Sequence, residues 1–207
     1  MSIVKLNNRG VRSATTFGSI TGLGSMVFIK KQTASSSATI SFVDGTSDVV
    51  LDDTYKEYLF TFNNIHGETD NQDFQFQGNA AGGSGYNETI TSTFILAQHD
   101  EADSYTSVEY QAGRDQAQGT AFQSLSTGIN SGDADSAFSG YLRLFNPSST
   151  TYTKHFMASG NNASNSAYSV NCFAAGYFNT TSAIDEIQFK IASGDIDAGD
   201  ICLYGIN

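Results

Sequence analysis

The stretch that decides the fold is Ile184-Asp-Glu-Ile-Gln-Phe-Lys-Ile-Ala-Ser-Gly-Asp-Ile-Asp-Ala-Gly-Asp-Ile-Cys-Leu-Tyr-Gly-Ile-Asn207. Apolar residues recur there at every second position, first at Ile187, Phe189 and Ile191 and again from Ile201. Because successive strand residues point to opposite faces, this alternation predicts two strands that each bury one face. The turn formers between them favour an antiparallel pair joined by a loop. We expect the last strand to lie inside a sheet.

The same alternation recurs along the chain from residue 25 onward, with turn signals between the runs. The expected strands are Met26–Lys31, Ala38–Val43, Tyr55–Ile65, Asp73–Gln77, Glu88–Leu96, Thr106–Tyr110, Gly140–Phe145, Thr153–Ala158, Ser169–Phe178, Ile187–Ile191 and Ile201–Gly205. A helical turn within 112–122 is disfavoured by its glycines and polar residues. The pattern predicts an all-β protein, an antiparallel β-sandwich of about ten short strands with jelly-roll-like connections. A closed barrel would need fewer and more even strands.

Charge divides the chain into two parts. The first 43 residues contain five basic residues and no acid, whereas the remaining 164 hold five basic and 21 acidic residues, a net charge of −16. We interpret residues 1–24 as an extended basic arm that anchors the protein, and residues 25–207 as the sandwich body. Lys5, Arg9 and Arg12 are the candidate partner-binding residues of the arm. For Lys30 and Lys31 an alternative is that they protect a strand edge, where lysine discourages sheet association.

Composition argues against several classes of protein. Ten cations against 21 acids cannot form a broad positive face, so we expect no nucleic-acid partner. No apolar run approaches the roughly 18 residues of a membrane-spanning helix, and the N-terminus lacks a signal-peptide core. We therefore expect a soluble protein without a membrane partner.

The two cysteines, Cys172 and Cys202, both lie in apolar, strand-like runs. The simpler interpretation is two buried free thiols. A disulfide between neighbouring strands is the alternative, and it requires Cα atoms within roughly 7 Å.

Residues that could support catalysis or bind a metal do not form a recognisable motif. The histidines are His66, His99 and His155, and no Gly-x-Ser-x-Gly surrounds any serine. The acids lie mainly in turns, and the absence of Trp argues against a glycosidase platform. We therefore predict no enzyme activity, no cofactor and no metal.

Calcium is the best metal alternative, because it accepts oxygen ligands from flexible loops. The carboxylate clusters are Asp195-Ile-Asp197 with Asp200, Asp133-Ala-Asp135, and His99-Asp-Glu-Ala-Asp103. None of them matches the spacing of a calcium-binding loop.

Five segments carry a likeness to a known group of proteins. They are Met1-Ser-Ile-Val-Lys-Leu-Asn-Asn-Arg-Gly-Val-Arg-Ser13, Gly24-Ser-Met-Val-Phe-Ile-Lys-Lys31, Ala38-Thr-Ile-Ser-Phe-Val-Asp-Gly45, Tyr55-Lys-Glu-Tyr-Leu-Phe-Thr-Phe62 and the closing stretch Ile184–Ile206. In these the chain resembles small structural proteins of tailed marine bacteriophages, including cyanophages. The likeness lies in the sequences of the expected strands and includes no catalytic motif, so no functional residue carries over.

This resemblance implies a non-enzymatic virion component, a capsid decoration protein or a tail appendage, present in many copies. Its expected partners are other virion proteins and further copies of itself, with a trimer among the symmetric assemblies. The expected location is the virion. The alternative is a carbohydrate-binding adhesion module that recognises host surface glycans through tyrosines and amides near the loops.

Overall fold

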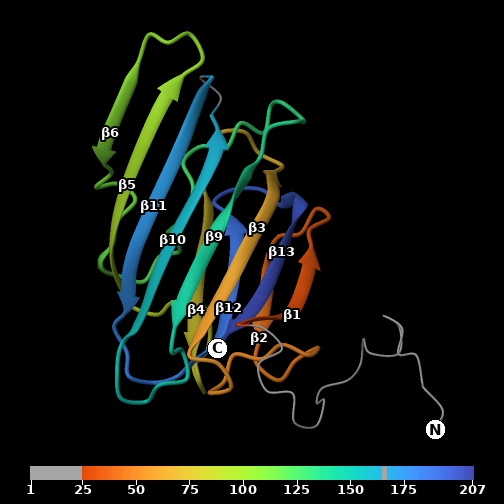
Figure 1. Cartoon of the computed structure of the whole chain (residues 1–207), viewed down its shortest axis with the longest axis vertical. Coiled ribbons are helices and arrows are strands. Elements are labelled where there is room, and N and C mark those ends of the chain that lie inside the picture. Colours follow the sequence, from red (N-terminus) through yellow and green to blue (C-terminus); the bar gives the residue numbers. More distant parts are fainter. Residues whose placement is uncertain (1–24, 165–166) are drawn as a thin grey trace, which may run out of the picture.

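A computed structural model describes residues 25–164 and 167–207 of the chain. Within them the protein is an antiparallel β-sandwich of thirteen strands without helix (Figure 1). The predicted all-β, jelly-roll-like sandwich is confirmed, with more strands than the ten expected. The predicted arm 1–24, with Lys5, Arg9 and Arg12, lies outside the described residues.

The large sheet has nine strands. Eight of them run in the order β1 (Met26–Thr33), β13 (Ile196–Ile206), β3 (Glu57–Gly67), β9 (Phe138–Phe145), β10 (Lys154–Ala163), β11 (Tyr168–Phe178), β5 (Ile90–Asp100) and β6 (Thr106–Tyr110). The ninth, β7 (Ala117–Gly119), pairs with β5 beside β6. Lys30 and Lys31 lie on the edge strand β1, as the edge-protection interpretation requires.

The small sheet contains the remaining four strands. Their order is β2 (Ile40–Val43), β12 (Ile184–Ile191), β4 (Phe74–Ala80) and β8 (Gln123–Ser124). The chain crosses repeatedly between the two sheets, because each strand of the small sheet, β2, β4, β8 and β12, is preceded and followed in the chain by a strand of the large sheet. This alternation gives the jelly-roll-like connections.

The pairing expected for the closing stretch is wrong. Strands β12 and β13 do not form a hairpin, because the loop between them crosses from the small sheet to the large one (Figure 1). Each strand has neighbours on both sides, β2 and β4 for β12, and β1 and β3 for β13. The expected interior position of the last strand is therefore confirmed. Alternation reports which face a strand buries, whereas the choice of partner depends on the rest of the sheet.

Aromatic rings fill the space between the sheets. Phe189 of β12 lies at their centre and contacts five other phenylalanine rings, with centroids 5.3–6.4 Å apart. Those rings come from both sheets: Phe42, Phe60, Phe62, Phe74 and Phe76. All six are buried, so the predicted alternation of the closing stretch and of Tyr55–Ile65 points into the core.

The small sheet is too narrow to cover the whole inner face of the large one. The residues 111–129, here called the cover segment, run from the edge of β5 in the large sheet to the edge of β4 in the small sheet. Leu125 and Ile129 of this segment are buried in the core, and its backbone bonds to β5 at Phe94 and Ser92. The short strands β7 and β8 belong to it, and they were not predicted because they are too short to show alternation.

Candidate functional site

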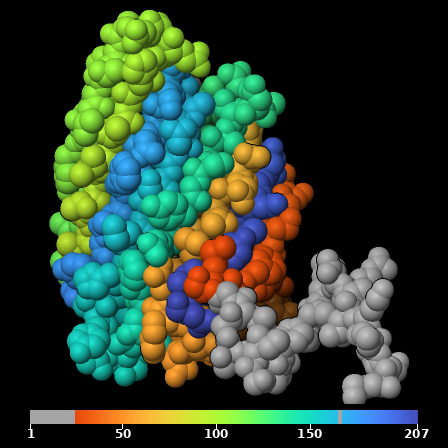
Figure 2. Space-filling view, viewed as in Figure 1, coloured from red at the N-terminus to blue at the C-terminus, as the bar shows by residue number. Residues whose placement is uncertain are grey.

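The candidate site is the face of the large sheet that points away from the small sheet. We call it the open face. Figure 2 shows it as a series of neighbouring diagonal bands from β5 to β1, with no described segment over its middle. Eight large apolar side chains on it are exposed to solvent: Met26, Phe28, Ile95, Val108, Tyr110, Tyr141, Met157 and Phe173. Monomeric proteins rarely expose so many large apolar side chains on one continuous surface.

Strand register places these residues side by side. Residues opposite one another in an antiparallel pair share a face, so the pairings Tyr110–Ile95, Ile95–Phe173 and Phe173–Ser159 form one row across four strands. The row continues from Ser159 to Tyr141 on β9. Four apolar side chains therefore run almost without interruption across five strands.

The open face is also depleted of charge, in contrast to the rest of the body. The three strands at its centre, β9, β10 and β11, contain no aspartate or glutamate, although the chain has 21. Towards β1, Glu57 forms an ion pair with Arg143. The result is a nearly neutral apolar surface on an acidic body.

A second ion pair lies at the β1 end of the face. Lys31 lies 3.0 Å from Asp200, and Thr33 donates a hydrogen bond to the same carboxylate. The hydrogen bond from Thr33, and then the bond from Lys31, lowers the pKa of Asp200 below its usual value. Because both partners are exposed, the pair neutralises the surface more than it stabilises the fold.

No family model, curated protein or solved structure matches this chain.

Two shallow grooves give the open face relief. The larger, about 730 Å³, is lined by Met26, Leu59, Tyr141 and Ile206 among others. The smaller, about 580 Å³, lies between β11, β5 and β6. The exposed rings of Phe173 and Tyr141 stand near these grooves, so the face carries both ridges and hollows.

A polar cleft of about 600 Å³ lies among the loops at one end of the sandwich. Amides and carboxylates line it: Asn64, Asn130 and Asn161 with Glu101, Asp133 and Asp135. The Asn130 amide donates to Asp133 at 2.8 Å, and the Asn161 amide donates to the Ser169 hydroxyl at 3.0 Å.

The structure disperses the carboxylates that the calcium alternative needs. In the closing loop, Asp200 bonds Lys31, Asp197 accepts from Ser36, and Asp195 donates its backbone N–H to Glu68. No group of three or more His, Cys, Asp or Glu residues in 25–164 and 167–207 could hold a metal ion. In the same part of the chain, no helix is long and apolar enough to cross a membrane.

Two histidines face carboxylates, but these carboxylates point to solvent. His66 lies 3.9 Å from Asp197 and His99 lies 3.2 Å from Asp103. The aspartate side chains are 50% and 92% exposed, whereas the aspartate that orients a catalytic histidine is buried. Both histidines lie on strands, His66 on β3 and His99 on β5, and neither pair has the buried carboxylate of a catalytic triad.

The two cysteines are buried free thiols, as the simpler interpretation predicted, and the disulfide alternative is wrong. Strands β3, β9 and β10 separate β11 from β13, so the two backbones lie about 19 Å apart. Cys172 also points into the core, and burial raises the pKa of its thiol to about 12.

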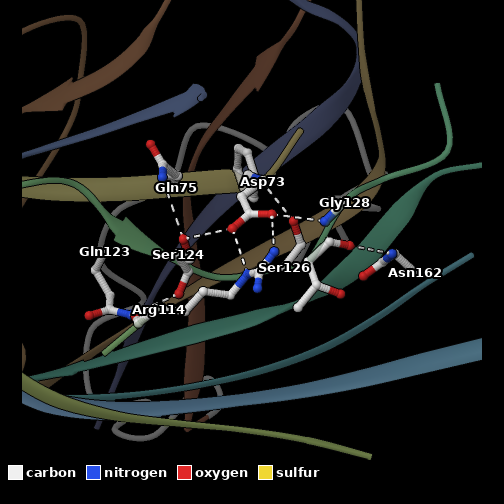
Figure 3. A network of polar contacts seen from close by, with 10 residues as sticks. Asp73, Gln75, Arg114, Gln123, Ser124, Ser126, Gly128 and Asn162 are labelled. Atoms are coloured by element: carbon white, nitrogen blue, oxygen red, sulfur yellow. Dashed lines mark hydrogen bonds and ion pairs between the residues drawn. The ribbon is translucent and has the colours of Figure 1, made fainter. Parts of the chain in front are cut away.

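A partly buried polar network holds the cover segment against the strands of both sheets (Figure 3). Asp73, just before β4, receives Arg114 Nε at 2.8 Å and Nη2 at 3.2 Å, so the two side chains pair at both oxygens. The same carboxylate accepts the Ser124 hydroxyl at 3.0 Å and the backbone N–H of Gly128 at 2.8 Å. Asp73 thereby binds the cover segment at three points.

Two amide side chains extend this network to the strands of the open face. Gln123 accepts from Ser92 of β5 at 2.6 Å and donates to the carbonyl of Arg114. Asn162 of β10 donates to the carbonyl of Thr127 at 2.8 Å. Sequence reasoning missed both the network and the open face. The one available signal for the face was that its central strands lack acids while carrying apolar residues on both parities.

Proposed function

We propose that this chain is a non-enzymatic structural protein of a phage virion, a capsid decoration or tail appendage component on the particle surface. The observation that carries the proposal is the open face, a broad, nearly neutral apolar surface on an otherwise acidic body. Such a surface suits packing against protein better than it suits catalysis or nucleic-acid binding. The likeness of the five quoted segments to phage structural proteins supports the same assignment.

Segregated charge supports docking of the protein through residues 1–24. That segment holds Lys5, Arg9 and Arg12 without an acid, whereas residues 25–207 hold seven cations and 21 acids, a net charge of −14. A basic arm is attracted to an acidic surface from which the body is repelled. The two parts of the chain would then serve attachment and exposure separately.

Particle incorporation tests this proposal. Deletion of residues 1–24 is expected to leave a folded body that no longer joins particles, because the attachment segment is gone. Within the full chain, Arg9→Ala is expected to lower occupancy, whereas Lys56→Ala, a cation removed from the body, is expected not to. Occupancy is measured by quantitative mass spectrometry of purified particles. Normal occupancy of the truncated protein would contradict arm-mediated docking.

The second candidate is an adhesion module that binds host surface glycans. The polar cleft favours it, because amides and carboxylates that converge on a cleft suit the hydroxyls of a sugar. The full chain on a glycan array should then bind a defined set of glycans, and Asn161→Ala should abolish the signal. Silence of the wild-type chain on the array would count against this candidate.

A further inference from the structure

We propose that the open face is a self-association surface, on which a second copy of this chain packs its own open face. The inference deepens the proposed function and rests on it only for its biological setting, since many copies on a particle would bring the faces together. Three properties of the face carry it: its size, its charge and its relief.

The size of the face matches a specific interface. Eight strands at a spacing of about 4.8 Å occupy about 38 Å, and four outward residues along a strand, one about every 6.7 Å, occupy about 27 Å, so the face offers about 1,000 Å². A stable protein–protein interface takes about 800 Å² from each partner. Two open faces therefore supply enough area without help from the loops.

Charge favours a second copy over a different partner. A body with net charge −14 repels its own copies, so self-association is least costly where the surface is neutral. On the open face the acids Glu57 and Asp200 are both paired with cations, the central strands carry no acid, and at the β6 edge Asp115 accepts the hydroxyl of Tyr110. A strongly basic partner would find nothing on this face to complement its charge. Two neutral faces, in contrast, meet without repulsion.

The open face carries both protruding side chains and grooves, so one copy of the face could pack against another. Phe173, about half exposed, and Tyr141 stand out from the same row, and the two grooves lie on the same surface. In a two-fold interface the same patch serves both subunits, so a patch must contain both ridges and hollows to pack on itself. Exposed aromatic side chains at the centre of a patch are the usual energetic anchors of an interface.

The experiment measures the mass and dissociation constant of the full chain. Sedimentation velocity between about 1 and about 100 µM covers the weak end of affinities for interfaces of this size. The wild-type chain is expected to self-associate. Phe173→Glu is expected to raise the dissociation constant at least tenfold, since each of two copies brings an unpaired charge into the interface. Tyr152→Glu places the same charge on an exposed tyrosine of the loop between β9 and β10, outside the strands of the face, and is expected to change nothing.

Two further measurements keep the test decisive. Phe173→Thr retains a strand-forming residue without charge and is expected to weaken association while preserving the circular dichroism spectrum, which separates lost contact from lost fold. Hydrogen exchange of the full chain is expected to show protection of β10 and β11 that grows with protein concentration.

Several outcomes would overturn the inference. One is a chain that stays monomeric at the highest concentration, because the face then awaits a different partner. Because β10 and β11 are already protected by their neighbours in the sheet, only the change with concentration is informative, and no change while the mass rises would contradict packing of the open face. Association unaffected by Phe173→Glu would place the interface elsewhere. None of these results touches particle docking, and normal occupancy after deletion of residues 1–24 would leave self-association standing.

Discussion

Replacing Asp73 with alanine tests whether the partly buried polar network supports the open face. The carboxylate accepts four hydrogen bonds, two of them from Arg114, and its side chain is only 15% exposed. Breaking a buried pair by removing one partner costs about 3–5 kcal/mol. Because the Arg114 side chain is 30% exposed and can regain water, we expect the lower end, about 3 kcal/mol. For a domain of this size that loss lowers Tm by about 6–12 °C.

The assay is urea denaturation followed by two spectroscopic probes, with coincident transitions required before a free energy is assigned. Arg114→Ala is expected to cost about 2 kcal/mol, because Asp73 keeps its bonds to Ser124 and Gly128. The double variant should show a coupling of about 1–2 kcal/mol. Asp53→Ala, an exposed aspartate, is the control and should stay within about 0.5 kcal/mol of wild type. A loss below about 1 kcal/mol for Asp73→Ala would refute the supporting role.

Three other changes follow from the geometry. Gly160→Ala is expected to cost about 1–3 kcal/mol in denaturation, because a Cβ there would collide with an aromatic ring on the neighbouring strand β9, whereas Gly113→Ala meets no atom and should be neutral. Cys172 should resist alkylation in the native protein at neutral pH and react only after unfolding, and rapid native labelling would contradict the assigned burial. Asp100→Asn should destabilise the protein at neutral pH, since the Ser104 hydroxyl foremost lowers the pKa of Asp100 in the folded state. The stability that this lowered pKa contributes is present above the unfolded value of 3.8 and is lost as the pH falls through the lower pKa of the folded state. The difference in Tm between Asp100→Asn and wild type should therefore narrow in acid. A difference in Tm that stays constant with pH would contradict this prediction.

Sequence patterns predicted which face of a strand is buried better than they predicted which strands pair with each other. The alternation of Ile187, Phe189 and Ile191 identified the residues that the structure buries, because burial is a local property of period two. The partner of the same strand was predicted wrongly, since pairing depends on strands more than a hundred residues away, such as β2 and β4. Local periodicity carries no information about contacts at that separation.

The candidate site was less accessible from sequence than the fold. Tyr141 and Phe173 lie on strands that were predicted, but their exposure depends on which face the small sheet covers. Asp73 and Arg114 are 41 positions apart, and nothing in either neighbourhood indicates that they meet. The dispersal of Asp195, Asp197 and Asp200 likewise became visible only when each was seen with its own partner.

The pairing of β1 with β13 has a practical consequence for engineering. The backbone N–H of Asn207 bonds the carbonyl of Ser25 at 2.9 Å, so the C-terminal residue lies beside the entry of residues 1–24 into the body. A reporter or purification tag joined after Asn207 would crowd the proposed attachment point. The turn between β5 and β6, residues 101–105, lies at the opposite end of an eleven-residue strand, about 36 Å along β5 (Figure 1). Cargo for display on a particle should therefore be inserted in that turn, where it would project away from the anchor.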